Sequence, residues 1–178
     1  MKLSEEINKK FRDCAFWIKE ASKETGIDPF VISAICWQES SFDPYAFRFE
    51  KDFLKKYVEP LTKAAIKKRN PSIGGAISED SERHGLAISW GAMQILGQTA
   101  RERGFNGVFL PALCGYPGIL YGSEHLVYLR ARHHDWDKVF SAYNAGSPTN
   151  KNQTSYVEAV LERLDILQNE KEVSRCFK

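Results

Sequence analysis

Apolar residues recur along the chain at the spacing of amphipathic helices, in which positions three and four apart share one face. The first such stripe consists of Ile7, Phe11, Cys14, Ile18 and Ala21. Ser4 precedes this stripe as a suitable N-cap residue, and Gly26 follows it as a residue typical of helix ends. The pattern therefore predicts a first helix over about residues 5 to 24.

Further helices follow from the same periodicity. Asp28 and Pro29 favour a helix start, and the apolar run behind them predicts a largely buried helix through Gln38. The remaining predicted helices cover about residues 47–57, 61–69, 90–103, 119–133, a short segment capped by Asp135, and 156–167. Glycine, proline, serine and acidic residues between positions 70 and 87 predict a loop. We therefore expect an all-α, mainly helical fold, with at most a small β-hairpin in the 70–90 loop.

Length and charge limit the classes of protein that this chain can be. Its 178 residues suit one domain, so we expect residues 1–178 to form a single domain. Hydrophobic residues make up 43% and charged residues 27%, which is typical of globular proteins. The net charge of +2 is too small to indicate nucleic-acid binding. We expect no nucleic-acid partner.

Cysteines, histidines and the amino terminus give no sign of a disulfide scaffold, a metal site, a signal peptide or a membrane span. The four cysteines are widely spaced without a CxxC pair, so we expect free thiols and no metal site or other cofactor. His133-His134-Asp135 is interpreted as a helix end, because adjacent residues do not share a helix face. The acidic start of the chain lacks the pattern of a signal peptide, and no apolar run is long enough to span a membrane. We expect synthesis in the cytoplasm without membrane insertion.

Glu39 is the first residue that points to chemistry. It directly follows the apolar run of residues 31 to 37, at a helix end before Ser40-Ser41-Phe42. A carboxyl group there is partly desolvated, which raises its pKa toward the value that a general acid needs. Taken by itself, Glu39 is equally well explained as a surface acid at a helix end.

Two later motifs favour a sugar-binding groove. Gly91-Ala92-Met93-Gln94 combines small residues with an amide, and Ala142-Tyr143-Asn144-Ala145-Gly146 ends a helix with hydroxyl and amide groups. Small residues allow a ligand to approach the backbone, and neutral polar groups hydrogen-bond to hydroxyl and N-acetyl groups. Each motif alone is weak, but the three occur in a fixed order.

In that order, the motifs resemble the signatures of the soluble lytic transglycosylase family, the SLT-domain enzymes of glycoside hydrolase family 23, which includes the goose-type lysozymes. The resemblance runs from about residue 27 to 167 and extends to Tyr156-Val157. It implies a lysozyme-like fold that cleaves the β-1,4 bond between N-acetylmuramic acid and N-acetylglucosamine in peptidoglycan. Glu39 would be the general acid/base, and the product would carry a 1,6-anhydromuramoyl end. The substrate-binding residues that the resemblance implies are Ser40, Met93, Gln94, Tyr143, Asn144 and Tyr156.

The chain also departs from the family pattern. Ala92 stands where the family usually has leucine, and Arg48 stands nine positions after the acid, where a small hydroxyl residue is common. The distance between Glu39 and Gly91 is unusually long, which indicates a helical insertion at about residues 45–88. This insertion contains the acids on which the reaction type depends.

Two alternative functions remain open. A hydrolytic muramidase would need a second carboxylate to position water; Glu50, flanked by aromatic residues, is the first choice, and the acids at 79, 80 and 82 are others. An inactive wall-binding or phage structural module is the third reading, against which the presence of Glu39 argues. The expected partner is the peptidoglycan glycan strand. We expect a monomer. Because the chain shows no visible signal peptide although its substrate is the cell wall, we expect it to reach the wall through a holin or another export route, as a phage-encoded endolysin does.

Overall fold

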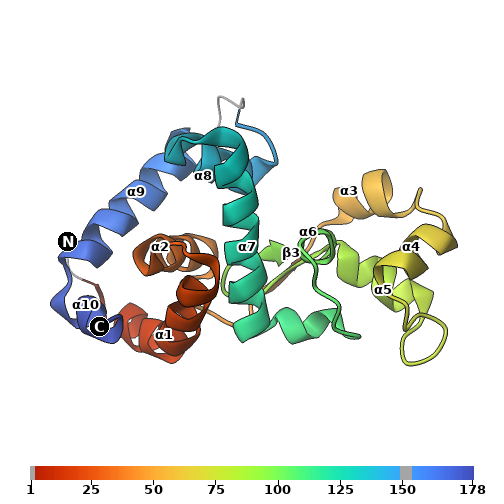
Figure 1. Cartoon of the computed structure of the whole chain (residues 1–178), viewed down its shortest axis with the longest axis horizontal. Coiled ribbons are helices and arrows are strands. Elements are labelled where there is room, and N and C mark those ends of the chain that lie inside the picture. The colour runs from red at the N-terminus through yellow and green to blue at the C-terminus, as the bar shows by residue number, and fades with distance from the viewer. Residues whose placement is uncertain (1–2, 149–153) are drawn as a thin grey trace.

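The computed structural model describes residues 3–148 and 154–178 and confirms a mainly helical fold (Figure 1). The longer helices are α1 (Glu5–Thr25), α2 (Pro29–Ser40), α7 (Tyr116–His133), α8 (Trp136–Ala145) and α9 (Thr154–Asn169). The shorter ones are α3 (Lys51–Phe53), η1 (Leu54–Val58, a π-helix), α4 (Lys63–Arg69), α5 (Glu79–Leu86), α6 (Gly97–Glu102), η2 (Leu110–Leu113, a 3₁₀-helix) and α10 (Lys171–Cys176). Among the described residues, no helix combines the length and hydropathy of a membrane span.

The ends of the first two helices follow from local side-chain chemistry, as the sequence predicts. The Ser4 hydroxyl accepts a hydrogen bond from the Ile7 amide at 3.3 Å, and Gly26 ends α1 with a φ of +71°. The Asp28 carboxylate accepts from the Phe30 amide at 2.8 Å, ahead of Pro29. These groups satisfy backbone atoms that a helix terminus leaves unpaired.

One lobe is built from helices around an apolar core. Helices α1, α2, α8, α9 and α10 gather on one side of α7 in Figure 1, and buried side chains from these helices form one continuous cluster. At its centre, Phe11 and Phe42 meet edge to face, with ring centroids 5.5 Å apart. Cys14 and Cys36 are buried in the same cluster as free thiols. This core fixes the end of α2, where Glu39 lies.

The other lobe contains a small antiparallel sheet of order β1-β2-β3. Its strands are β1 (Phe47–Phe49), β2 (Ile88–Trp90) and β3 (Ile95–Leu96). A second apolar cluster, which includes Val58, Ile66 and Leu86, packs beside this sheet. Helix α7 contacts α1 and α8 in the first lobe and α6 and η2 in the second, so it joins the two.

The expected helix at 47–57 is wrong in its first part. Residues 47 to 49 pair with 88 to 90 as strand β1, and only residues 51 to 58 are helical. The alternation of Phe47, Arg48 and Phe49 suits a strand, because neighbouring side chains on a strand point to opposite faces. A partner strand 40 positions away supplies the backbone hydrogen bonds, and local periodicity does not reveal that pairing.

Two further segments differ from the prediction. The expected loop at 70–87 contains helix α5, whose N-cap is Ser78, so two of the three sheet strands flank this segment instead of lying inside it. The expected helix at 90–103 is wrong in its first half, because residue 90 ends β2, a turn with a φ of +70° at Gly91 and +47° at Gln94 leads to β3, and α6 begins only at residue 97. A Cβ atom at Gly91 would lie 2.5 Å from the Leu113 carbonyl oxygen, so only glycine fits there.

A buried ion pair joins α5 to α6 within the second lobe. Arg101 Nε lies 2.8 Å from Glu82 Oε1, and Arg101 Nη2 lies 3.1 Å from Glu82 Oε2. Asn70 donates to Glu82, and Arg101 Nη1 donates to the carbonyls of Phe105 and Gly107. The pair is fully hydrogen-bonded, as a buried charge pair must be to persist.

Replacing Arg101 with methionine is expected to lower the free energy of unfolding by about 3–5 kcal/mol, because it leaves the Glu82 charge buried and unpaired. Urea denaturation followed by circular dichroism measures this change. Lys10→Met, which breaks an exposed pair with Glu6, is the control and should change stability little. A similar loss in both variants would contradict the structural importance of the buried pair.

Candidate active site

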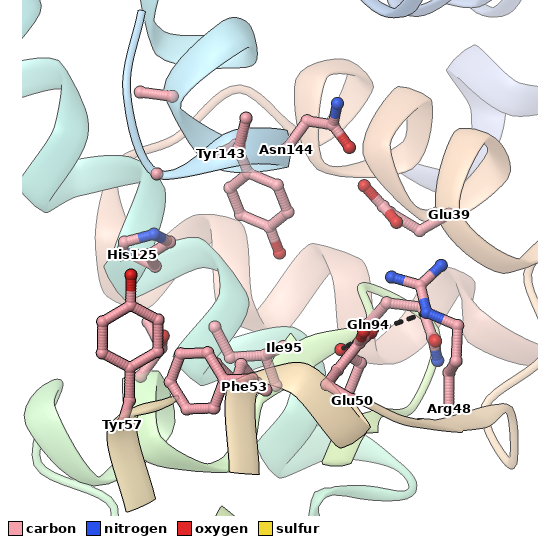
Figure 2. Close-up of a pocket in the computed structure, with 16 residues that line it drawn as sticks. Glu39, Arg48, Glu50, Phe53, Tyr57, Gln94, Ile95, His125, Tyr143 and Asn144 are labelled. Atoms are coloured by element: carbon pink, nitrogen blue, oxygen red, sulfur yellow. Dashed lines mark hydrogen bonds and ion pairs between the residues drawn. The ribbon is translucent and has the colours of Figure 1, made fainter. Parts of the chain in front are cut away.

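A pocket of about 440 Å³ lies between the two lobes and receives side chains from both (Figure 2). The first lobe contributes the end of α2, His125 of α7 and the end of α8, and the second contributes β1, α3, η1 and the segment 89–99. Its lining residues are Glu39, Arg48, Glu50, Phe53, Tyr57, Ser89, Gln94, Ile95, Leu96, Thr99, His125, Ala142, Tyr143, Asn144, Ala145 and Gly146. All three sequence motifs therefore contribute to one pocket.

Glu39 lies in the last turn of α2 and is half-buried at the pocket wall. The Tyr156 hydroxyl of α9 donates a hydrogen bond to Glu39 Oε1 at 2.5 Å. Burial raises the pKa of Glu39 above its ordinary value, while the Tyr156 hydrogen bond and the Arg48 charge act in the opposite direction. The net effect keeps a larger fraction of this carboxyl protonated, which suits a proton donor.

The chain leaves α2 through two residues of positive φ, Ser41 at +55° and Phe42 at +62°. Such a conformation is unusual for a side chain as large as that of phenylalanine and is maintained only by its surroundings. The Phe42 ring is completely buried, and its amide donates to the Cys36 carbonyl at 3.1 Å. This turn ends the helix directly behind Glu39 and fixes the position of its carboxyl group.

Ser40 and Met93 act in the scaffold and not in the pocket wall. The Ser40 hydroxyl lies 2.8 Å from the Ala92 carbonyl and accepts from the Asp43 amide at 3.0 Å. It joins α2 to the second motif, and its expected contact with substrate stays a prediction. The Met93 side chain is fully buried, with its sulfur 3.8 Å from the Ser123 hydroxyl. Met93 was expected to line the groove, but its side chain is not among the residues that line the pocket.

Gln94 lies in the pocket wall as expected. Its amide nitrogen donates to the carbonyls of Ala46 at 3.1 Å and Gly91 at 3.0 Å. These bonds hold the side chain across the turn that Gly91 makes. Among the described residues, no hydrogen bond reaches Gln94 Oε1, so this oxygen is available to accept one from a ligand.

The third motif brings Tyr143 and Asn144 to the pocket at the end of α8, where Gly146 stops the helix with a φ of +73°. The Tyr143 hydroxyl donates to the Met93 carbonyl at 2.9 Å, so it connects the second and third motifs. Burial and the nearby Glu39 charge raise the pKa of Tyr143 well above its usual value. Tyr156, and not Tyr143, is the tyrosine that hydrogen-bonds to the Glu39 carboxylate.

Glu50 is the second carboxylate in the pocket, as the sequence suggests, but it is already engaged. Arg48 Nε lies 2.6 Å from Glu50 Oε1, and the Ser89 hydroxyl donates to the same oxygen at 3.2 Å. In Figure 2 a dashed line joins Arg48 to Glu50, on the side of the pocket nearest Glu39. The positive charge of Arg48 thus acts on both carboxylates.

The other candidate acids lie outside the pocket wall. Glu79 pairs with Arg83 at 2.7 Å, Glu82 forms the buried pair with Arg101, and Asp80 is exposed in the first turn of α5. Acidic residues are favourable in this first turn because of the helix dipole. Their positions are explained by α5 and by ion pairing, without a role in the pocket.

Sequence reasoning missed three residues at the far end of the pocket: Phe53, Tyr57 and His125. Burial and the Arg103 charge lower the pKa of His125 to about 4, so this imidazole is neutral at physiological pH. Phe53 and Tyr57 are four positions apart in a segment predicted as helical, and that spacing was the available signal. Among the described residues, no group of three or more His, Cys, Asp or Glu side chains could hold a metal ion.

The chain thus combines a mainly helical fold with a half-buried carboxyl group of raised pKa in a pocket that polar and aromatic side chains line. The family model described as Transglycosylase SLT domain matches residues 16–166, so the chain belongs to this family. Members are lytic transglycosylases, and this chain is accordingly an enzyme of that type that acts on peptidoglycan. No curated protein and no solved structure matches the chain significantly.

Replacing Tyr156 with phenylalanine removes the hydrogen bond that favours ionised Glu39, so the pKa of Glu39 should rise further. Because a general acid acts in its protonated form, the alkaline limb of the pH profile of kcat/KM should move upward by about one pH unit. Initial rates on purified peptidoglycan across pH measure this shift. Tyr143→Phe is the control, because the Tyr143 hydroxyl donates to the Met93 carbonyl and its loss should not move that limb. Equal shifts in both variants would contradict the assignment of Tyr156 as the partner of Glu39.

Proposed function

We propose that this enzyme cleaves the β-1,4 bond between N-acetylmuramic acid and N-acetylglucosamine with Glu39 as its general acid and base. The observation that carries this proposal is the half-buried Glu39 carboxyl, hydrogen-bonded to Tyr156 within the pocket between the lobes. A carboxyl group with a raised pKa is suited to protonate a leaving oxygen near neutral pH. The three family motifs surround this same carboxyl group.

In the proposed reaction, protonated Glu39 gives its proton to the glycosidic oxygen as the bond from that oxygen to the muramoyl anomeric carbon breaks. The N-acetylglucosamine side leaves with a free hydroxyl group. The Glu39 carboxylate then takes the proton from the muramoyl 6-hydroxyl group. At the same time the oxygen of this hydroxyl group bonds to the anomeric carbon. The product is a 1,6-anhydromuramoyl end, no water is consumed, and Glu39 returns to its protonated form.

The state of Glu50 favours this route over hydrolysis. A hydrolytic glycosidase usually needs a second carboxylate that acts on water or on the sugar. Within the described chain, Glu39 and Glu50 are the two acids that line the pocket, and Glu50 is held by Arg48 and Ser89. Glu50 Oε1 already accepts hydrogen bonds from Arg48 and Ser89, so Glu50 is better suited to holding Arg48 in place than to binding and orienting a water molecule.

The pocket wall supplies neutral groups for the sugar. Gln94 Oε1 can accept a hydrogen bond from a hydroxyl or N-acetyl group, and Asn144 lies beside Tyr143 on the opposite wall. We propose that Gln94 and Asn144 contact substrate, while Tyr143 and Tyr156 position the turn of the second motif and the Glu39 carboxyl. Ser40 and Met93 support the same positions from behind the wall.

The wider setting of the enzyme is also a proposal. We propose that residues 1–178 form one catalytic domain and that the enzyme works as a monomer. The substrate lies outside the cytoplasmic membrane, and a holin or another export route, as used by phage-encoded endolysins, would bring the enzyme to it. No cofactor has a part in the proposed reaction.

The proposed reaction predicts a specific product. Digestion of purified peptidoglycan should yield muropeptides with anhydro ends, each lighter by one water than the corresponding reducing-end product. Mass spectrometry of the soluble fragments distinguishes the two. A digest with a known hydrolytic muramidase is the reference for reducing ends. Reducing ends alone from this enzyme would overturn the transglycosylase assignment and favour the lysozyme reading.

The two pocket carboxylates should differ in importance. Glu39→Gln should reduce the rate of wall solubilisation by at least about a thousandfold, because it removes the proton donor. Glu50→Gln should retain much more activity, since Arg48 and Ser89 can still bond to the amide oxygen. Turbidity loss of wall suspensions measures both. Equal losses would favour a hydrolase with two acids, and full activity in Glu39→Gln would refute Glu39 catalysis.

A further inference from the structure

The far end of the pocket contains an aromatic surface without an assigned role. Phe53 and Tyr57 lie with ring centroids 4.9 Å apart, at an interplanar angle of 41°. Both line the pocket, and Tyr57 is 48% exposed although it is large and aromatic. Figure 2 shows this pair with His125 at one end of the pocket and Glu39 with Arg48 at the other. The aromatic end is therefore separate from the acid.

The segment that carries this pair is a short π-helix. Phe53 ends α3, and Tyr57 belongs to η1. The first and last residues of η1, Leu54 and Val58, are buried in the second core. Single π-helical turns are rare and often occur at functional sites, because they turn side chains away from regular helical positions. Here the buried residues anchor the turn, and Tyr57 projects into the pocket.

His125 adds a directional polar group to the aromatic surface. Its Nδ1 atom is buried, and no hydrogen-bond partner for it exists in the described part of the chain. A buried lone pair costs less than a buried N–H without a partner, so the proton of the neutral ring is assigned to Nε2. The ring is held between Tyr128 and Tyr143, with centroids 6.0 and 5.5 Å away. Nε2–H is then the donor of a ring that lines the pocket.

The charges at this end distinguish between possible ligands. Lys56 Nζ lies 5.0 Å from the centroid of the Tyr57 ring, but Lys56 does not line the pocket. Apart from Glu39, Arg48 and Glu50, the residues that line the pocket are neutral, among them Leu96 and Thr99. A peptide stem with free carboxylates would require a cation here. An uncharged pyranose ring can instead place its C–H face on an aromatic ring and accept a hydrogen bond from His125.

We propose that Phe53, Tyr57 and His125 form a sugar subsite that binds an N-acetylhexosamine unit of the glycan strand at a distance from the bond that Glu39 cleaves. This inference rests on the proposed function, because it takes the glycan as the substrate of the pocket. Tyr57 and Phe53 provide the stacking surface, and His125 Nε2 donates to a hydroxyl or N-acetyl oxygen. Since both aromatic residues belong to the 45–88 insertion, that insertion extends the part of the glycan strand that the enzyme binds.

The test measures binding of the β-1,4-linked N-acetylglucosamine hexamer to the full chain with Glu39→Gln, which should not cut it. Isothermal titration gives the Kd. Adding Tyr57→Ala should weaken binding about tenfold or more, because the stacking surface is lost. Tyr57→Phe keeps the ring and should stay within about threefold of the parent. Phe16→Ala is the matched control, because Phe16 is 69% exposed on α1 outside the pocket wall and should leave the Kd unchanged.

Three results would overturn the subsite: an unchanged Kd in Tyr57→Ala, no measurable hexamer binding by the parent, or a loss that appears only with peptide-bearing strands. The last would assign the surface to the stem peptide. In an otherwise wild-type chain, Tyr57→Ala should raise KM on glycan strands and still form anhydro ends. Activity retained by Glu39→Gln would refute the proposed function whatever the hexamer affinity, whereas an inactive Glu39→Gln with a Tyr57-independent Kd would refute the subsite alone.

Discussion

The hydrogen bond between Tyr156 and Glu39 joins residues 117 positions apart and holds the one carboxyl group on which the proposed chemistry depends. A carboxyl group at the end of an apolar helix loses hydration, and its pKa rises. Left without a partner, it would be costly and free to rotate. Helix α9 supplies the hydroxyl, and the core shared by α2 and α9 sets the distance between the two side chains.

Arg48 places a second limit on this carboxyl group. Its charge opposes the effect of burial on the pKa of Glu39, and the same guanidinium group is paired with Glu50. Arg48 lies in β1 and Glu50 follows directly after that strand, where Arg48 Nε lies 2.6 Å from Glu50 Oε1. Arg48, which departs from the family pattern, is thus paired with a carboxylate of opposite charge, that of Glu50.

The insertion at about residues 45–88 contributes to the core, the sheet and the pocket of the second lobe. It builds a second core, contributes an edge strand to the sheet and carries Phe53 and Tyr57 to the pocket. The buried pair of Glu82 and Arg101 lies within this lobe and joins α5 to α6. Because α7 contacts both lobes, the position of the pocket wall in the second lobe is set relative to the end of α2 in the first.

The sequence by itself determined the mainly helical class, the ends of α1 and α2, and the family, because helix caps, apolar periodicity and ordered motifs are local. It also singled out Glu39, Gln94, Tyr143, Asn144 and Tyr156, the residues that the structure brings to or beside one pocket. Only the tertiary structure decided the strand pairing of 47–49 with 88–90, the burial of Met93, the ion pairing of Glu50 and the inclusion of His125. Each of these depends on contacts between residues far apart in the chain, and no local pattern encodes such contacts.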